Sequence, residues 1–208
     1  FSMQIFVLGT GRCGSFSFIE ACKYITNFTC GHETRSQKLG SARFDYPKNH
    51  IEADNRLSWH LGELEQKFPD QVFYVHLKRD RDKTAKSFSK RFFKKKSMVD
   101  AYAGGIKMNP PEMLSKEEQL QLCYDYVDTV TANIDEFLKH QPQHITIQLE
   151  NIKEDFEKFW NAIQAEGDLQ AALNSFNQRH NTAKEHEKSH FLYHLKLFLL
   201  RQKKRLLS

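Results

Sequence analysis

The chain has 208 residues and a mass of 24.5 kDa, which suits one domain with a sizeable core and excludes a long repeat array. Apolar residues make up 39% of the chain, too many for a disordered protein. Its 31 Lys and Arg exceed its 26 Asp and Glu, and the net charge of +5 favours anionic partners but is too small for a protein that coats nucleic acid.

Strand and helix patterns alternate along the first half of the chain. Residues 4–8 form a short apolar run, residues 9–14 form a glycine-containing turn, and residues 15–25 carry apolar side chains at helical spacing. The same order returns in an apolar run over residues 72–77 and a helical pattern over residues 84–93. A repeated strand, turn and helix predicts an α/β domain whose mainly parallel sheet is flanked by helices.

The remaining patterns extend this domain without a break. Residues 57–67 and 115–140 are predicted to be helices, and residues 144–149 are predicted to be a third strand. Beyond residue 150 the chain turns polar and helical. We therefore expect one P-loop-like domain over residues 1–208, with a helical C-terminal half.

Two segments of the second half bear on the site and on assembly. Residues 101–111 contain a Gly-Gly and a Pro-Pro pair, which predict a loop that is able to move over a site. Near the C-terminus, apolar side chains form one helical stripe: Leu192, Leu195, Phe198 and Leu199. We expect this stripe to pack against the domain, and it is also a candidate surface for pairing two subunits in a homodimer.

The cysteines and the apolar runs indicate the compartment. The 4 cysteines are too few for a disulfide scaffold and lack metal-ligand spacing, so free thiols in the cytoplasm are expected. No signal-peptide pattern opens the sequence, in which Phe1 and Ser2 resemble a tag remnant before Met3. The longest apolar run, residues 191–200, has half of the ~20 residues that cross a bilayer, so we expect no membrane span.

The turn over residues 9–14 has the composition of an anion-binding loop. Glycines between a strand and a helix aim backbone N–H groups and the positive helix end at an anion, and Arg12 adds a guanidinium for phosphate or sulfate oxygens. The Walker A pattern does not fit, because Gly14 is followed by Ser15 rather than by Lys and then Ser or Thr. The alternative is a structural turn that binds no ligand.

A second anion-binding turn is predicted after the strand over residues 72–77. Arg79 follows this strand, and Ser87 lies eight residues later on the next helix, so both side chains are able to converge on one phosphate. Taken alone this pattern is weak, because charged residues at strand ends are usually just solvated.

Together the two turns resemble those of the sulfotransferases that use 3′-phosphoadenosine 5′-phosphosulfate (PAPS). In that family the first loop has a Lys or Arg followed by Ser, Gly and Thr or Ser, and the second signature is an Arg with a Ser eight residues later. The resemblance implies that Arg79 and Ser87 bind the 3′-phosphate, that 3′-phosphoadenosine 5′-phosphate (PAP) is the product and that no metal is needed. It also implies that the 5′-phosphosulfate binds the first loop, which consists of Gly11, Arg12, Cys13, Gly14, Ser15, Phe16 and Ser17.

A third segment is similar to one branch of this family, the tyrosylprotein sulfotransferases. The stretch Cys30-Gly-His-Glu-Thr-Arg35 resembles their Cys-Gly-Glu-Glu-Thr-Arg, in which the second glutamate is the catalytic base, and Glu33 is the matching position. Such a carboxylate removes the proton of the acceptor hydroxyl, while Arg12 and the loop amides stabilise the departing phosphate. Arg35 matches a residue that positions an acidic peptide, or it only balances the charge of Glu33. The likeness covers roughly residues 4–93 and leaves the acceptor open between a peptide tyrosine, a carbohydrate and a small molecule.

The chain departs from the family at several positions. Cys13 stands where serine is usual, and Phe16 stands where a second threonine is common. Beside Arg12 and a helix N-terminus, Cys13 is expected to have a lowered pKa, although no His or Asn partner marks it as a nucleophile. Adenosine contacts are expected near residues 179–184. The family's lysine for the bridging oxygen is missing, and the candidates to replace it are Arg56, Lys48 and Lys107.

Two other functions stay open. A P-loop-like nucleotide phosphotransferase fits the fold class, but the glycine loop lacks the lysine that it needs. A nucleic-acid-binding module is suggested by basic residues interleaved with Phe88, Phe92 and Phe93. At helical spacing these rings are expected in the core, so we expect a hydroxyl-bearing acceptor as the partner, and no nucleic acid.

Overall fold

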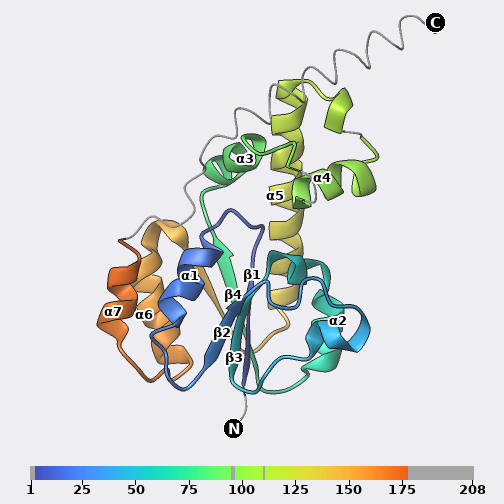
Figure 1. The fold of residues 1–208 in the computed structure, drawn as a ribbon. Coiled ribbons are helices and arrows are strands. Elements are labelled where there is room, and N and C mark those ends of the chain that lie inside the picture. Colours follow the sequence, from blue (N-terminus) through green and yellow to red (C-terminus); the bar gives the residue numbers. More distant parts are fainter. Residues whose placement is uncertain (1–2, 95–96, 110, 178–208) are drawn as a thin grey trace, which may run out of the picture.

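A five-stranded parallel sheet forms the centre of the fold (Figure 1). The computed structural model describes residues 3–94, 97–109 and 111–177. Every neighbouring pair of strands is parallel, which confirms the predicted α/β class. The spatial order is β2-β3-β1-β4-β5, with the strands β1 (Gln4–Leu8), β2 (Thr29–His32), β3 (His50–Ala53), β4 (Val72–Lys78) and β5 (His144–Gln148).

Helices cover both faces of the sheet. Successive strand residues point to opposite faces, so Ile5 and Val7 of β1 enter one core and Phe6 and Leu8 enter the other. This explains why β1 is an unbroken apolar run. The Ile5 face is covered by α1 (Ser15–Cys22), α6 (Ile152–Ala162) and α7 (Leu169–Ser175). The Phe6 face is covered by α2 (Leu61–Lys67) and α5 (Lys116–Leu138).

Capping residues determine where several predicted helices begin. The side chain of Asp80 accepts a hydrogen bond from the backbone N–H of Lys83 at 2.8 Å, so α3 (Arg81–Ser89) starts before residue 84, where the periodicity places its beginning. α5 starts directly after Ser115, whose side chain forms a capping box with Glu118. The helix predicted over residues 57–67 divides into a 3₁₀ turn (Asn55–Trp59) and α2.

The segment predicted as a loop over residues 101–111 is largely helical. α4 (Met98–Ala101) continues into a π-helical turn (Tyr102–Ile106), and a 3₁₀ turn follows at Pro111–Met113. The ring of Tyr102 is buried and packs against Tyr126 of α5, with 5.5 Å between the ring centroids. The loop prediction therefore does not hold for the π-helical turn.

The C-terminal half is mainly helical as far as it is described, with α5, α6 and α7, and it also contributes β5 to the sheet. The predicted apolar stripe at Leu192, Leu195, Phe198 and Leu199 lies outside the described residues, as do the adenosine contacts expected near residues 179–184. No helix within residues 3–94, 97–109 and 111–177 is both long enough and apolar enough to cross a membrane.

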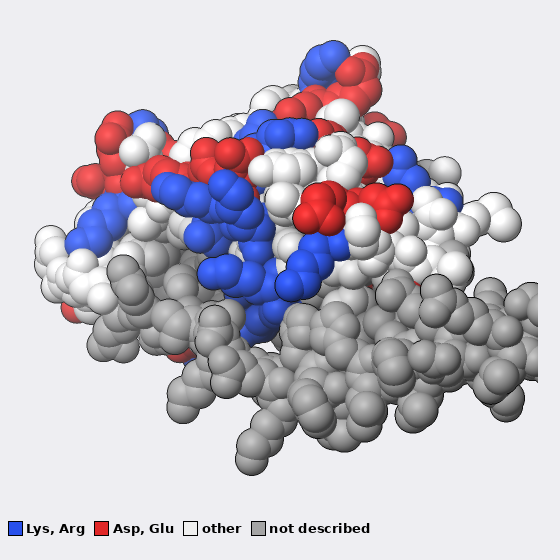
Figure 2. Space-filling view, turned by 90° about the horizontal axis from the view of Figure 1, so that it is seen from above, with Lys and Arg blue, Asp and Glu red and all other residues white. Residues whose placement is uncertain are grey.

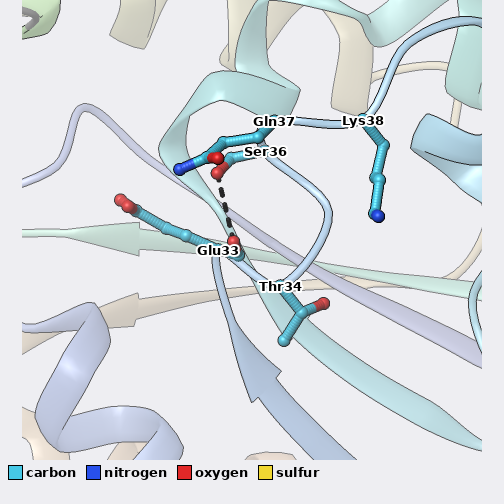
Figure 3. Close-up of a pocket in the computed structure, with 5 residues that line it drawn as sticks. All are labelled: Glu33, Thr34, Ser36, Gln37 and Lys38. Atoms are coloured by element: carbon cyan, nitrogen blue, oxygen red, sulfur yellow. Dashed lines mark hydrogen bonds between the residues drawn. The ribbon is translucent and has the colours of Figure 1, made fainter.

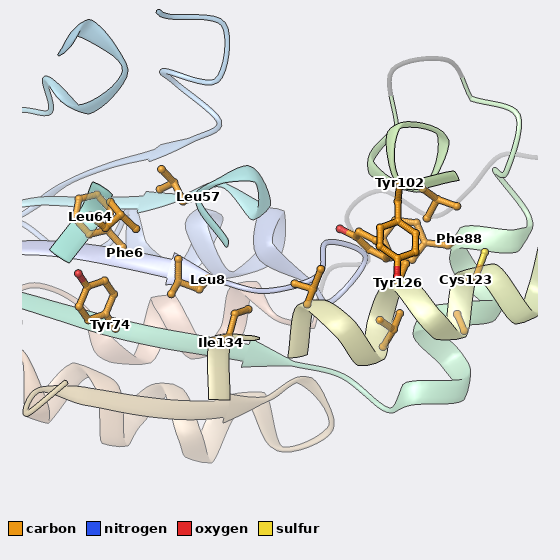
Figure 4. Packing of buried hydrophobic residues seen from close by; sticks show 14 of the residues in the cluster. Phe6, Leu8, Leu57, Leu64, Tyr74, Phe88, Tyr102, Cys123, Tyr126 and Ile134 are labelled. Carbon is orange, nitrogen blue, oxygen red and sulfur yellow. The ribbon is translucent and has the colours of Figure 1, made fainter. Parts of the chain in front are cut away.

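Tyr126 of α5 connects the core on the Phe6 face to the turn after β1 (Figure 4). Its ring is buried against Phe88, and its hydroxyl donates a hydrogen bond to the Thr10 carbonyl at 2.7 Å. Tyr126→Phe should lower the free energy of unfolding by about 1–2 kcal/mol, because the buried carbonyl loses this donor. Urea unfolding followed by circular dichroism measures the loss.

Tyr124 offers a matched control on the same helix. Its hydroxyl donates to Asp82 Oδ1 at 3.1 Å at the exposed surface. Tyr124→Phe should change the free energy of unfolding by less than about 0.5 kcal/mol. Equal losses in the two variants would contradict the anchoring role of Tyr126.

Buried His76 of β4 makes the stability of the fold depend on pH. Burial, with a smaller contribution from the charge of Lys78, lowers the pKa of His76 to about 4, although Asp135 opposes the shift. An unfolded histidine titrates near 6.5, so between pH 6.5 and 4 the unfolded state binds more protons and stability falls as the pH drops. Over this window the wild type should lose up to about 3 kcal/mol more than His76→Gln. Urea unfolding at several pH values tests this, and parallel curves for the two proteins would contradict it.

Candidate functional site

The two predicted anion-binding turns lie next to each other at the carboxyl edge of the sheet. The turn over residues 9–14 follows β1, the turn at Arg79 follows β4, and these two strands are neighbours. The chain leaves β1 toward β2 on one side of the sheet and leaves β4 toward β5 on the other (Figure 1). Crevices at such a change of direction are the usual ligand sites of open α/β sheets.

The first turn needs its glycines for conformation and for space. Gly11 and Gly14 have φ angles of 80° and 93°, which favour glycine. A Cβ atom at Gly11 would lie 2.8 Å from Asn55 Nδ2, and one at Gly14 would lie 2.6 Å from Leu149 Cδ1. Arg12 between them adopts a φ of 58°, a conformation that costs an L-residue roughly 1–2 kcal/mol. The surrounding structure therefore holds Arg12 in a strained conformation.

Arg12, Arg79 and Ser87 converge although they are far apart in sequence. Arg12 Nε donates a hydrogen bond to Ser87 Oγ of α3 at 3.0 Å. Arg79 Nη1 donates to the Arg12 carbonyl at 3.1 Å. The structure thus joins the first loop and the second turn into one site.

A third arginine, Arg91, belongs to this cluster, whereas the sequence placed it only among the basic residues of the candidate nucleic-acid-binding module. Burial lowers the pKa of Arg12 most, and the charges of Arg91 and Arg79 lower it further. The Nε atom of Arg91 is buried and has no hydrogen-bond partner among the described residues. Arg91 lies four residues after Ser87 but beyond Ser89, the last residue of α3, so helical periodicity did not mark it.

The arginine cluster, formed by Arg12, Arg79 and Arg91, lacks a carboxylate partner among the residues that the structure describes. Within the described part of the chain none of the three forms an ion pair. Figure 2 shows Lys and Arg side chains gathered into a band on the face seen from above, with acidic side chains beside it. Unpaired guanidinium groups at the end of parallel strands suit a ligand with several negative charges.

The other predicted residues of the first loop differ in burial and in contacts. Cys13 is buried, and burial raises the pKa of its thiol to about 11, so the expected lowering is wrong. Ser15 Oγ lies 3.0 Å from His32 Nε2, at the end of β2. Phe16 is exposed and its ring meets that of His32 edge to face at 5.7 Å, while Ser17 is half-buried in α1.

Glu33 lies in the turn after β2 and pairs with Arg56. Its Oε2 atom is 3.1 Å from Arg56 Nη1, which is also 3.8 Å from Asp54 Oδ1. The contact between Ser15 and His32 joins this turn to the first loop. The structure therefore brings Glu33 and Arg56 together beside the predicted phosphosulfate loop.

Arg35 and the lysine candidates lie elsewhere. Arg35 Nη1 is 3.9 Å from Asp45 Oδ2, so the charge of Glu33 is balanced by Arg56 and not by Arg35. Residue 48 precedes β3 and lies at the amino end of the sheet, opposite the two turns, which removes Lys48 as a candidate. Lys107 Nζ pairs with Asp125 Oδ2 of α5 at 3.1 Å. Arg56 is thus the candidate cation nearest to Glu33.

A polar pocket of about 300 Å³ adjoins Glu33 (Figure 3). The hydroxyl of Ser36 donates a hydrogen bond to the Glu33 carbonyl at 3.1 Å. Every lining side chain carries a hydrogen-bonding group: Glu33, Thr34, Ser36, Gln37 and Lys38. A hydroxyl-bearing molecule is able to form several hydrogen bonds there.

The aromatic residues of the basic helix face the core. Phe88 and Phe92 are buried in the core on the Phe6 face, and Phe93 packs against it. The expectation that these rings are core residues is confirmed. They do not form an exposed platform on which bases stack.

Comparison of the sequence with known proteins adds no assignment to this geometry. No protein-family model and no curated protein matches the chain. Among the residues that the structure describes, no group of three or more His, Cys, Asp and Glu is arranged to hold a metal ion.

Proposed function

We propose that the protein is a PAPS-dependent sulfotransferase that transfers the sulfuryl group to an acceptor hydroxyl. The observation that carries the proposal is the contact of Arg12 with Ser87 at 3.0 Å, with Arg79 bonded to the Arg12 carbonyl. The motif residues that the resemblance assigns to the two phosphate ends of PAPS thus lie in one site. Arg91 adds a further positive charge to this site.

The proposed chemistry uses two parts of the site, the first loop with Arg12 and the pair of Glu33 and Arg56. The acceptor oxygen attacks sulfur and forms an O–S bond, while the bond between sulfur and the bridging phosphate oxygen breaks and leaves its electron pair on PAP. Glu33 accepts the acceptor proton, and Arg12 with the loop amides offsets the charge that develops on the phosphate. Arg56 is placed to orient Glu33, 3.1 Å away.

Calorimetric titration of the full chain with PAP, without added metal, tests the proposal. Adenosine 5′-monophosphate is the control, because it lacks only the 3′-phosphate. Tight binding of PAP that depends on this phosphate would support the PAPS site. Equal binding of both nucleotides would overturn it and favour a nucleotide phosphotransferase, and salt-sensitive RNA binding without PAP binding would favour a nucleic-acid module.

The acceptor and the compartment are part of the same proposal. The polar pocket beside Glu33 suits a hydroxyl-bearing acceptor, whether peptide, carbohydrate or small molecule. The four cysteines are free thiols, and three of them are buried, so we keep the cytoplasm as the proposed location.

A further inference from the structure

A buried carboxylate, Glu52 of β3, holds the turn that carries Glu33. The side chain of Glu52 is 0% exposed and accepts two hydrogen bonds from Thr34. The backbone N–H of Thr34 donates to Oε1 at 2.6 Å, and the Thr34 hydroxyl donates to Oε2 at 2.8 Å. The preceding N–H, that of Glu33, donates to the Ala53 carbonyl at 3.0 Å. Two successive amides of the turn are therefore fixed to two successive residues of β3.

This fixation holds Glu33 in an unusual conformation. Its φ angle is 54°, a left-handed value that an L-residue keeps only where its surroundings enforce it. The side chains of Glu33 and Thr34 consequently diverge, as Figure 3 shows. Thr34 turns back to the sheet, and Glu33 extends toward Arg56.

The residues around Glu52 accommodate its contact with Thr34. His50 Nε2 lies 3.0 Å from Glu52 Oε2, and the other ring nitrogen of His50 lies 2.8 Å from Thr29 Oγ1. Gly31 leaves the space that the contact needs, because a Cβ atom there would lie 2.4 Å from Thr34 Cγ2 and 2.9 Å from Glu52 Oε2. A buried carboxylate with all its partners is weak evidence for stability, since apolar residues of similar volume often serve as well. A carboxylate at this position is therefore better explained by the conformation that it imposes on the turn than by a gain in stability.

We propose that Glu52 is a positioning residue, which fixes the Thr34 side of the turn and thereby directs Glu33 at the acceptor. This role rests on the proposed function, in which Glu33 is the base. Glu52 itself touches neither substrate, because its side chain is fully buried. Its loss should therefore impair turnover and spare the binding of PAP.

Two variants of the full chain test this role. Glu52→Gln replaces one acceptor oxygen by a donor, and Thr34→Val removes one hydroxyl at nearly constant volume. Each should lower kcat for cleavage of PAPS, with water as the acceptor, by about tenfold or more, while the Kd for PAP stays within about twofold. Thr34→Ser keeps the hydroxyl and should restore kcat. Hydrogen exchange at the amide of residue 34 should be about tenfold faster in Glu52→Gln.

The outcomes separate this role from the proposed function. Unchanged exchange at residue 34, or faster exchange with unchanged kcat, would overturn the positioning role although PAP still binds. Parallel losses of kcat and PAP affinity would overturn it as well, because they indicate general damage. Failure of the wild type to bind PAP would instead overturn the proposed function, and the role of Glu52 with it.

Discussion

Arg79→Ala should weaken the binding of PAP by about 100-fold. A guanidinium that contacts a phosphate contributes roughly 1.5–3 kcal/mol, and Arg79 also secures the first loop through the Arg12 carbonyl at 3.1 Å. Ser87→Ala removes a neutral hydroxyl and should weaken binding by only about fivefold to tenfold. Calorimetry with PAP measures both effects, and the loss should be much smaller for adenosine 5′-monophosphate, which lacks the 3′-phosphate.

Arg81 provides the matched control for Arg79. It lies two residues further along the chain, and its guanidinium forms two hydrogen bonds of 2.6 Å with Asp128 at the exposed surface. Arg81→Ala removes the same charge but no contact to the first loop, so PAP should bind as it does to the wild type. If Arg79→Ala and Ser87→Ala also bind PAP like the wild type, the assignment of the 3′-phosphate is wrong.

The arginine cluster was largely predictable because its signals are local. Glycines after an apolar strand, with Arg12 between them, define an anion-binding turn wherever the strand lies in the sheet. The positions of Arg79 and Ser87 in space depend only on where β4 ends and on the phase of α3, the helix that follows. Their convergence with Arg12 required β1 and β4 to be neighbours, which the alternation of strands and helices favoured. Arg91 lies after the last residue of α3, where helical periodicity no longer predicts its direction.

The half of the site around Glu33 was less predictable because β2 and β3 do not have an apolar pattern. β3 has the sequence His-Ile-Glu-Ala, and its two polar side chains, His50 and Glu52, are buried. Their partners come from distant positions, Thr29 and Thr34, so no local pattern indicates that the carboxylate is satisfied. The Arg56 contact of Glu33 likewise depends on the pairing of β2 with β3. A short inner strand with two buried polar side chains departs from the rule that apolar runs mark parallel strands.

Glu33→Gln should lower turnover of PAPS by about 10²–10⁴-fold and leave the Kd for PAP unchanged. Glutamine keeps the size of the side chain and its contact to Arg56, but it does not accept the acceptor proton at neutral pH. The binding half of the site, with Arg12, Arg79 and Ser87, does not involve Glu33. Steady-state release of PAP from PAPS, measured beside calorimetry, separates the two effects.

Glu136→Gln is the control, because it makes the same chemical change at an exposed position of α5 and should leave turnover unchanged. Full turnover in Glu33→Gln would remove Glu33 as the base. His32 would then be the next candidate, since its Nε2 lies 3.0 Å from Ser15 Oγ in the first loop. His32→Gln should then lose the turnover that Glu33→Gln keeps, because a glutamine side chain does not accept the acceptor proton. Comparison of the two variants therefore decides between the two residues that the turn after β2 brings to the first loop.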